Sequence, residues 1–152
     1  MKYFMSVVFC FLLLALSSCG DQGTGPYLKI LGGGFEFNYR YSTMKYGFVV
    51  KQLRPLPAGS TLEASFDLPD SEKKFMQTLP AESGKMQYVF ESEALHGVKK
   101  DVPYKVKLRL LEADTAKELE VVEHEFSSSE DQAALPTKAP VTGIGYQLAP
   151  EN

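Results

Sequence analysis

The chain has 152 residues, with 16 lysine and arginine residues against 19 aspartate and glutamate residues, and a formal net charge of −3 at pH 7. Such a mildly acidic chain lacks the basic surface that attracts nucleic acids, so we expect no nucleic-acid partner. Cys10 and Cys19 are its only cysteines, which excludes a framework of several disulfides and a cysteine-rich metal cluster.

The first twenty residues have the pattern of an export signal. Lys2 precedes a run of apolar residues from Met5 to Leu16, and small residues follow this run. A transmembrane helix needs about 20 apolar residues, and this run is too short for one. A basic start, a short apolar core and small residues at its end are typical of a secretory signal peptide. We therefore expect residues 1–18 to be removed.

The end of that signal, Leu16-Ser17-Ser18-Cys19, resembles the lipobox of bacterial lipoproteins. The resemblance implies cleavage before Cys19, a diacylglycerol on its sulfur, and a fatty acid such as palmitate on the new amino group. Several acyl chains anchor a protein stably, whereas one binds only marginally. In enteric bacteria, aspartate directly after this cysteine retains a lipoprotein in the inner membrane. Gly20 stands there, so we expect an outer-membrane lipoprotein that faces the periplasm. An ordinary cleaved signal or an uncleaved anchor helix is the alternative.

The rest of the chain divides into three parts by composition. Residues 19–28 are rich in glycine and form a flexible tether. Residues 29–126 carry periodic apolar patterns and form a β-sandwich domain. Residues 127–152 form a tail rich in proline and serine that is extended or docked on the surface. Within the tail, residues 141–148 are a candidate for a short edge strand.

Apolar and polar residues alternate with period two along most of the domain, which predicts β-strands. The seven predicted strands are 35–41, 44–50, 62–68, 75–79, 86–90, 104–110 and 119–126. Short strands at near-regular spacing, with almost no helical periodicity, favour a single antiparallel Ig-like or fibronectin-III-like sandwich. A two-residue turn at Ser42-Thr43 would pair Tyr39 with Tyr46 and Phe35 with Val50.

One local motif supports this fold class. The segment Leu95-His96-Gly97, followed by Tyr104 at the start of the next strand, resembles the corner between the fifth and sixth strands of fibronectin type III domains. The resemblance implies that Tyr104 opens its strand and hydrogen-bonds back across the corner.

The last predicted hairpin contains a break in its apolar pattern. Leu119 and Val121 have one parity, whereas Val122 and Phe126 have the other. A β-bulge between Val121 and Val122 would restore inward pointing. We then expect three cross-strand charge pairs, which are Arg109 with Glu120, Lys107 with Glu123, and Lys105 with Glu125.

The sequence offers no constellation for catalysis, a cofactor or a metal. His124 lies between two glutamates that point to the opposite face of a strand, and His96 lies in a turn, so we expect a half-buried strand histidine and no metal site. The stretch Gly32-Gly33-Gly34 precedes a predicted strand, which argues against a phosphate loop and favours a flexible lead-in or a bulge where backbones approach closely. Glu91 and Glu93 share a face and indicate a solvated surface rather than a catalytic pair.

The aromatic residues of the first hairpin are the richest feature. The stripe Phe35, Phe37, Tyr39 and Tyr41 fills the core or forms a binding platform, and we favour core. If Tyr39, Tyr41 and Tyr46 run past the core, their hydroxyls mark the partner contact. We expect a lipid-anchored, non-catalytic binding or assembly module with an envelope-protein partner. The alternatives are a cell-surface lipoprotein that contacts glycan or host material and, third, an enzyme.

Overall fold

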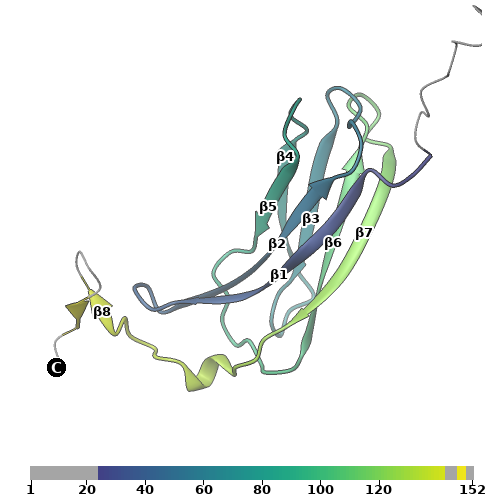
Figure 1. The fold of residues 1–152 in the computed structure, drawn as a ribbon. Coiled ribbons are helices and arrows are strands. Elements are labelled where there is room, and N and C mark those ends of the chain that lie inside the picture. The colour runs from purple at the N-terminus through teal and green to yellow at the C-terminus, as the bar shows by residue number, and fades with distance from the viewer. Residues whose placement is uncertain (1–23, 143–146, 150–152) are drawn as a thin grey trace, which may run out of the picture.

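The computed structural model describes residues 24–142 and 147–149, and its main body is a β-sandwich (Figure 1). Residues 1–18 and the lipobox cysteine lie outside the described residues. Two antiparallel sheets pack face to face, with strand orders β1-β2-β5 and β4-β3-β6-β7. The predicted all-β sandwich is therefore confirmed. The strands are β1 (Leu28–Asn38), β2 (Thr43–Gln52), β3 (Thr61–Asp67), β4 (Lys74–Pro80), β5 (Gln87–Glu91), β6 (Pro103–Leu111) and β7 (Glu118–Ser127).

The position of β4 defines the type of sandwich. In constant-type immunoglobulin domains the fourth strand joins the sheet of the first strand. Here β4 pairs with β3, from Thr61 opposite Pro80 to Asp67 opposite Lys74. The second sheet therefore has four strands and the first has three, an arrangement that is fibronectin-III-like.

The core lies between the sheets and follows the predicted alternation. In β3, Leu62, Ala64 and Phe66 are fully buried, while the residues between them are partly exposed. Aromatic rings fill the centre, where Phe48 stacks on Phe90 with ring centroids 5.3 Å apart. Burial of each large apolar side chain contributes about 1.5–3 kcal/mol, so the core can hold the sandwich together without a disulfide.

The register of the first hairpin differs from the prediction. Phe35 lies opposite Tyr46, and Phe37 lies opposite Met44, so the pairing of Tyr39 with Tyr46 is wrong. Residues 39–42 form the loop. The side chain of Asn38 accepts a hydrogen bond from the Arg40 N–H at 3.0 Å, and its carbonyl accepts one from the Tyr41 N–H at 3.2 Å. Asparagine side chains favour such turns, whereas Ser-Thr is a poor two-residue turn.

The β6–β7 hairpin confirms two of the three expected pairs. Lys107 lies opposite Glu123, and Lys105 lies opposite Glu125, but Arg109 lies opposite Val121 rather than Glu120. The bulge also lies nearer the turn than predicted, because Leu110 pairs with Glu120 and Leu111 with Glu118.

A contact with β1 explains the position of this bulge. The Glu120 carboxylate accepts hydrogen bonds from the backbone N–H groups of Tyr27 at 2.6 Å and Leu28 at 3.2 Å. This contact holds Glu120 at the start of β1, so Leu119 becomes the extra residue of β7.

His124 is exposed, rather than half-buried as had been expected. Its ring centroid lies 4.6 Å from that of Phe126.

The predicted tyrosine corner is present. Tyr104 is buried, and its hydroxyl accepts a hydrogen bond from the Lys99 N–H at 3.0 Å. Gly97 has φ +80, a conformation that other residues rarely adopt. Leu95 is buried beside this turn. The corner fixes the connection between β5 and β6 at the same end as the β1–β2 loop.

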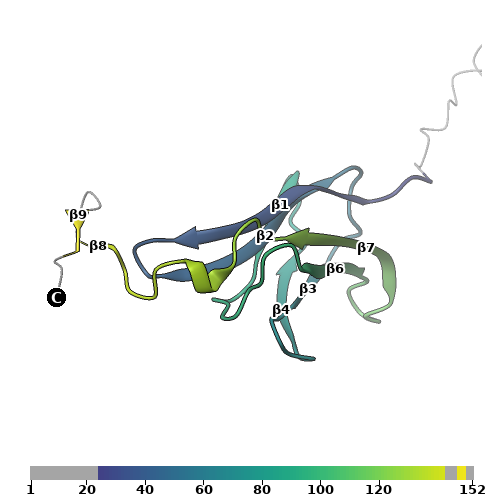
Figure 2. The same cartoon turned by 90° about the horizontal axis from the view of Figure 1, so that it is seen from below.

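The first part of the tail docks on the sandwich through Gln132, which opens the short 3-10 helix η2 (Gln132–Ala134). Its backbone N–H donates to the Val98 carbonyl at 2.9 Å, and its side chain bonds to Val98 N–H at 3.1 Å and Leu95 O at 2.8 Å. The expected edge strand is wrong, because β8 (Val141–Thr142) and β9 (Gln147–Leu148) pair only with each other. Figure 2 shows them beyond the hairpin loop.

Candidate functional site

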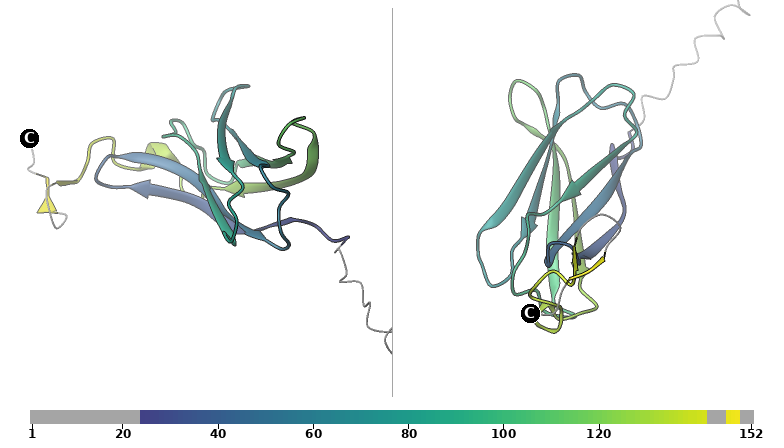
Figure 3. Two further views of the ribbon diagram at one scale, coloured as in Figure 1. Left: turned by 90° about the horizontal axis from the view of Figure 1, so that it is seen from above. Right: turned by 90° about the vertical axis from the view of Figure 1, so that its left-hand side faces the viewer.

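The β1–β2 hairpin reaches beyond the other strands of the sandwich (Figures 1 and 3). Its loop and the start of β1 lie at opposite ends of an 11-residue strand, which spans about 35 Å at roughly 3.3 Å per residue. At the loop, the side chains of Tyr39 and Tyr41 are 52% and 67% exposed. Two of the three predicted contact tyrosines therefore lie together at one end of the molecule. The favoured assignment of the stripe to the core is wrong for these two residues, whereas Phe35 and Phe37 pack against the core.

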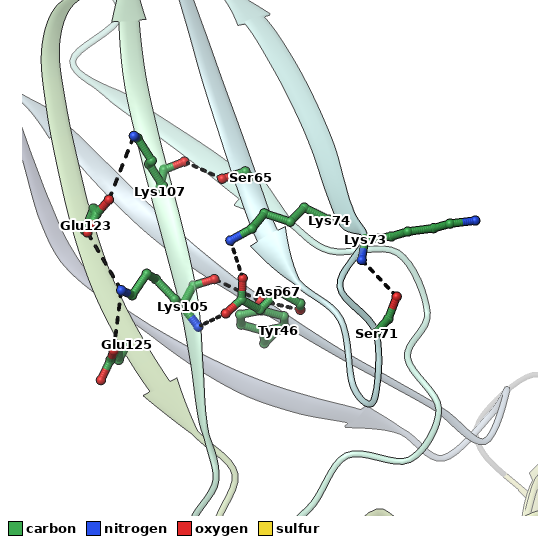
Figure 4. A network of polar contacts seen from close by, with 10 residues as sticks. All are labelled: Tyr46, Ser65, Asp67, Ser71, Lys73, Lys74, Lys105, Lys107, Glu123 and Glu125. Atoms are coloured by element: carbon green, nitrogen blue, oxygen red, sulfur yellow. Dashed lines mark hydrogen bonds and ion pairs between the residues drawn. The ribbon is translucent and has the colours of Figure 1, made fainter.

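Tyr46 does not belong to this patch. It is 1% exposed, and its ring stacks on Phe35 with centroids 4.8 Å apart. Its hydroxyl donates a hydrogen bond to the Asp67 carbonyl at 2.8 Å (Figure 4). Burial, with the nearby Asp67 carboxylate, raises the pKa of Tyr46, so the phenol stays neutral. Tyr46 is a core residue, and the contact prediction fails there because the loop is longer than the assumed turn.

A shallow hollow lies on the outer face of the first sheet, next to the exposed tyrosines. Its floor contains glycine, because Gly34 lies opposite Gly47. A Cβ atom built at Gly32 or Gly34 would meet nothing within 4 Å. We call this region, with a volume of about 430 Å³, the outer-sheet hollow. Its main lining residues are Gly34, Glu36, Tyr41, Lys45, Gly47, Val49, Val89 and Glu91.

Gly33 faces the other way and has a structural role. A Cβ atom there would overlap the Gly47 carbonyl oxygen and lie 2.8 Å from both the Phe126 ring and the Phe48 Cα. The expectation of a flexible lead-in is wrong, because the three glycines lie within β1. A bulge lies just before them, between Ile30 and Gly32, and the expected close backbone approach is present at Gly33. Sequence reasoning missed the hollow itself, although Val49 and Val89 have the outward parity in their strands.

The outer face of the second sheet has a different character (Figure 4). Lys74 contacts the Asp67 carboxylate at 2.7 Å, and Lys105 lies 4.0 Å from both Glu123 and Glu125. Arg109 forms an ion pair with Glu63, which raises the pKa of the Arg109 guanidinium. Opposite charges therefore compensate one another across these strands, as expected of a solvated face.

The described part of the chain contains no group of three or more histidine, cysteine, aspartate or glutamate side chains that could hold a metal ion. His96 and His124 are both exposed and come from different elements. Glu91 borders the outer-sheet hollow, and its backbone N–H donates to the Gln77 side chain at 3.0 Å. Glu93 is exposed in the following loop.

Comparison with known proteins adds no relative. No protein-family model matches the chain, and a search of curated proteins finds no match. Among residues 24–142 and 147–149, no helix has the length and apolar character needed to cross a membrane.

Proposed function

We propose that this protein is a lipid-anchored lipoprotein of the bacterial envelope, bound to the outer membrane, facing the periplasm and acting as a non-catalytic binding or assembly module. One observation carries the proposal. The projecting hairpin presents Tyr39, Tyr41 and the outer-sheet hollow together, whereas the outer face of the second sheet carries several compensated charge pairs beside the exposed Met76.

The position of the anchor supports this division. A lipid on Cys19 is separated from β1 by a tether that spans at most about 30 Å when fully extended. β1 then leads away from its start toward the loop at residues 39–42. Anchoring through Cys19 would therefore hold the start of β1 near the membrane and present the tyrosines at the far end of the strand.

The chemistry of the hairpin suits protein contact. Tyrosine buries a large ring and offers a hydroxyl, at a low cost in side-chain entropy, which is why tyrosines are enriched at binding hot spots. The outer-sheet hollow gives a partner side chain a place beside Val49 and Val89. Val89 is 58% exposed, so its burial by a partner would contribute to binding.

A second candidate function is contact with glycan or host material at the cell surface. The observation that favours it is the polar lining beside Tyr41, which includes Glu36, Asn38 and Glu91. A sugar ring stacks on an aromatic face while its hydroxyls bond to such side chains. Protease treatment of intact cells separates the two candidates, because it degrades a surface-exposed protein and spares a periplasmic one.

Chemical crosslinking in living cells tests the first candidate. Tagged protein is purified after crosslinking, its partners are identified by mass spectrometry, and the Cys19→Ala variant is the control. A reproducible envelope protein that disappears from the variant is the expected result. Full anchoring of the wild type with no protein partner would contradict the assembly role and favour the glycan candidate.

A further inference from the structure

The distal half of β1 has backbone groups that point away from its own sheet. The Ser92 N–H donates to the Tyr46 carbonyl at 2.8 Å, and the Tyr46 N–H donates to the Ser92 hydroxyl at 3.1 Å. The backbone of Tyr46 therefore faces the β5 side. Since Phe35 lies opposite Tyr46, these two residues form a non-hydrogen-bonded pair, and the N–H and C=O groups of Phe35 point outward.

The same pattern continues to Phe37. Its partner Met44 accepts a hydrogen bond from the Leu95 N–H at 2.7 Å, so Met44 also faces the β5 side. Among the described residues, no strand pairs with the outward edge of β1 between residues 33 and 37. We call this segment the distal β1 edge. It presents a row of donors and acceptors that a further strand could use.

The other strand edges carry features that oppose pairing. β5 has only five residues, and the Gln77 side chain accepts its Glu91 N–H at 3.0 Å. β4 starts at Lys74 and ends at Pro80. β7 contains a bulge and the glutamates that face β6. Short length, lysine, proline, bulges and charges are the devices by which natural sheets protect their edges.

The distal β1 edge lacks these devices. Between Gly32 and Asn38 its sequence is GGGFEFN, with Glu36 as the single charge and without lysine or proline. The register to β2 is continuous over these residues, because the irregularity lies earlier, between Ile30 and Gly32. The segment therefore keeps a regular ladder to β2 without a bulge, as an incoming strand requires.

The side chains next to this edge indicate what an incoming strand would carry. On the inner side, Phe35 and Phe37 are partly buried and offer apolar contact. On the outer side, Gly32 and Gly34 have open space where a Cβ would stand, which leaves room for a large side chain. Glu36 is exposed on the same side, and a basic residue would complement it.

We propose that the distal β1 edge binds an extended segment of a partner protein as an added strand, with apolar residues beside Phe35 and Phe37 and a basic residue beside Glu36. This mode of recognition takes its affinity from main-chain hydrogen bonds and its specificity from alternate side chains. The inference rests on the proposed function and names the chemistry of the partner.

The anchor argues against a second copy as the occupant. Antiparallel pairing of two β1 strands would direct their starting residues to opposite ends of the joint sheet. Two lipids on Cys19 would then lie at opposite ends as well, while both copies belong to one membrane under the proposed function. A partner strand carries no such restriction.

The test uses the full lipidated chain in detergent micelles and a phage-displayed library of linear seven-residue peptides. We expect enriched peptides with alternating apolar residues. Peptide binding should slow the hydrogen exchange of the Phe35 and Phe37 amides, and leave the Gly34 and Glu36 amides, which already face β2, unchanged.

Three variants isolate the backbone contribution. Phe37→Ala removes the ring and keeps the N–H, whereas Phe37→Pro removes both. Phe37→Pro should bind the enriched peptides about tenfold more weakly than Phe37→Ala, since one buried acceptor of the peptide loses its donor. Thr78→Pro is the matched control on β4. The Ala81 N–H donates to the Ser60 carbonyl just before β3, so the N–H of Thr78, three residues earlier, points away from β3 to the free edge of β4. It should bind as the wild type does.

Several outcomes would overturn the proposal. These are the absence of enriched peptides, equal affinity of Phe37→Pro and Phe37→Ala, and protection of the Thr78 amide in place of Phe35 and Phe37. Protection of the distal β1 edge by self-association, without peptide, would mean that a second copy occupies it. The proposed function fails separately, when Tyr41→Ala leaves in-cell crosslinks to the envelope partner unchanged.

Discussion

On the outer face of the β4-β3-β6-β7 sheet, cations and carboxylates alternate from strand to strand, as in the contacts of Lys74 with Asp67 and of Lys107 with Glu123. On the outer face of the β1-β2-β5 sheet, glycines and valines form a hollow that ends at the exposed Tyr41. On both sheets, side chains that point to the outer face alternate along each strand with side chains that point into the core. The outer face of the second sheet carries mainly paired charges beside the exposed Met76. The outer face of the first sheet exposes Tyr41 and Val89 among a few charged side chains.

This difference shows why composition alone is a poor guide to the interacting surface. The chain is only mildly acidic, and its charges gather where they compensate one another. Exposed Tyr39 and Tyr41 lie at the loop of a hairpin that extends past the core (Figure 3). Four single substitutions, a pH series, two double-mutant cycles and one crosslinking measurement can break or sharpen the comparison.

The largest effect is expected within the glycine stretch. Gly33→Ala should lower the free energy of unfolding by about 3 kcal/mol, because the new Cβ overlaps the Gly47 carbonyl and crowds Phe48. Gly34→Ala, whose Cβ enters open space, should change it by less than about 1 kcal/mol. Urea unfolding of both variants gives the measurement. Equal losses would contradict the assignment of Gly33 to the core side and Gly34 to the outer side.

Tyr46→Phe should have a moderate effect of about 1 kcal/mol, because the Asp67 carbonyl loses its hydrogen bond. Tyr41→Phe, at an exposed position, should leave stability unchanged. The two variants separate the buried tyrosine from the exposed one. Identical unfolding curves for Tyr46→Phe and the wild type at neutral pH would contradict the buried position.

The same residue predicts a pH dependence. The pKa of Tyr46 is raised in the folded state above its ordinary value of about 10. The folded state then holds a proton that the unfolded state releases, so stability falls as the pH rises above about 10. Tyr46→Phe should remove part of this fall when unfolding is followed between about pH 9 and pH 11. An unchanged slope would show that the phenol ionises freely in the folded protein.

The smallest effects belong to the charged face. A double-mutant cycle on Arg109 and Glu63 should give a coupling energy below about 1 kcal/mol, because the Arg109 side chain is 38% exposed and solvent screens the pair. A cycle on Lys107 and Glu123, whose charged atoms lie 4.0 Å apart, should give less. Both values should fall in about 1 M salt. A coupling that resists salt would mean that this face is less solvated than described.

Much of the fold could be predicted from alternation alone. Six of the seven strands, the inward residues of β3 and the role of Tyr104 follow from local patterns, whereas β1 begins at Leu28, before the predicted start at residue 35. The register of the first hairpin could not be predicted in this way. Tyr39, the predicted partner of Tyr46, and Phe35, its actual partner, have the same parity in the strand. A shift by an even number of residues preserves every inward position. The turn at Asn38 decided between the registers, through one side-chain hydrogen bond.

The site was harder to predict for a related reason. The outer-sheet hollow depends on which glycine lies opposite which residue, so it follows from the register and not from the sequence of one strand. The bulge at Leu119 depends on Glu120, which contacts Tyr27 and Leu28 more than ninety residues away in the chain. Tyr39 and Tyr41 were expected to be strand residues in the core, and they are exposed because β1 ends at Asn38 and residues 39–42 form the loop.

Photocrosslinking in living cells from the two outer faces tests the central claim most directly. A photoreactive phenylalanine derivative is placed at Tyr41 in one strain and at Lys107, in the charged face, in another. We expect crosslinked envelope material from position 41 and none from position 107, and loss of the position-41 product when Cys19→Ala is added. Equal products from both positions, or products from position 107 alone, would contradict the assignment of binding to the β1–β2 hairpin.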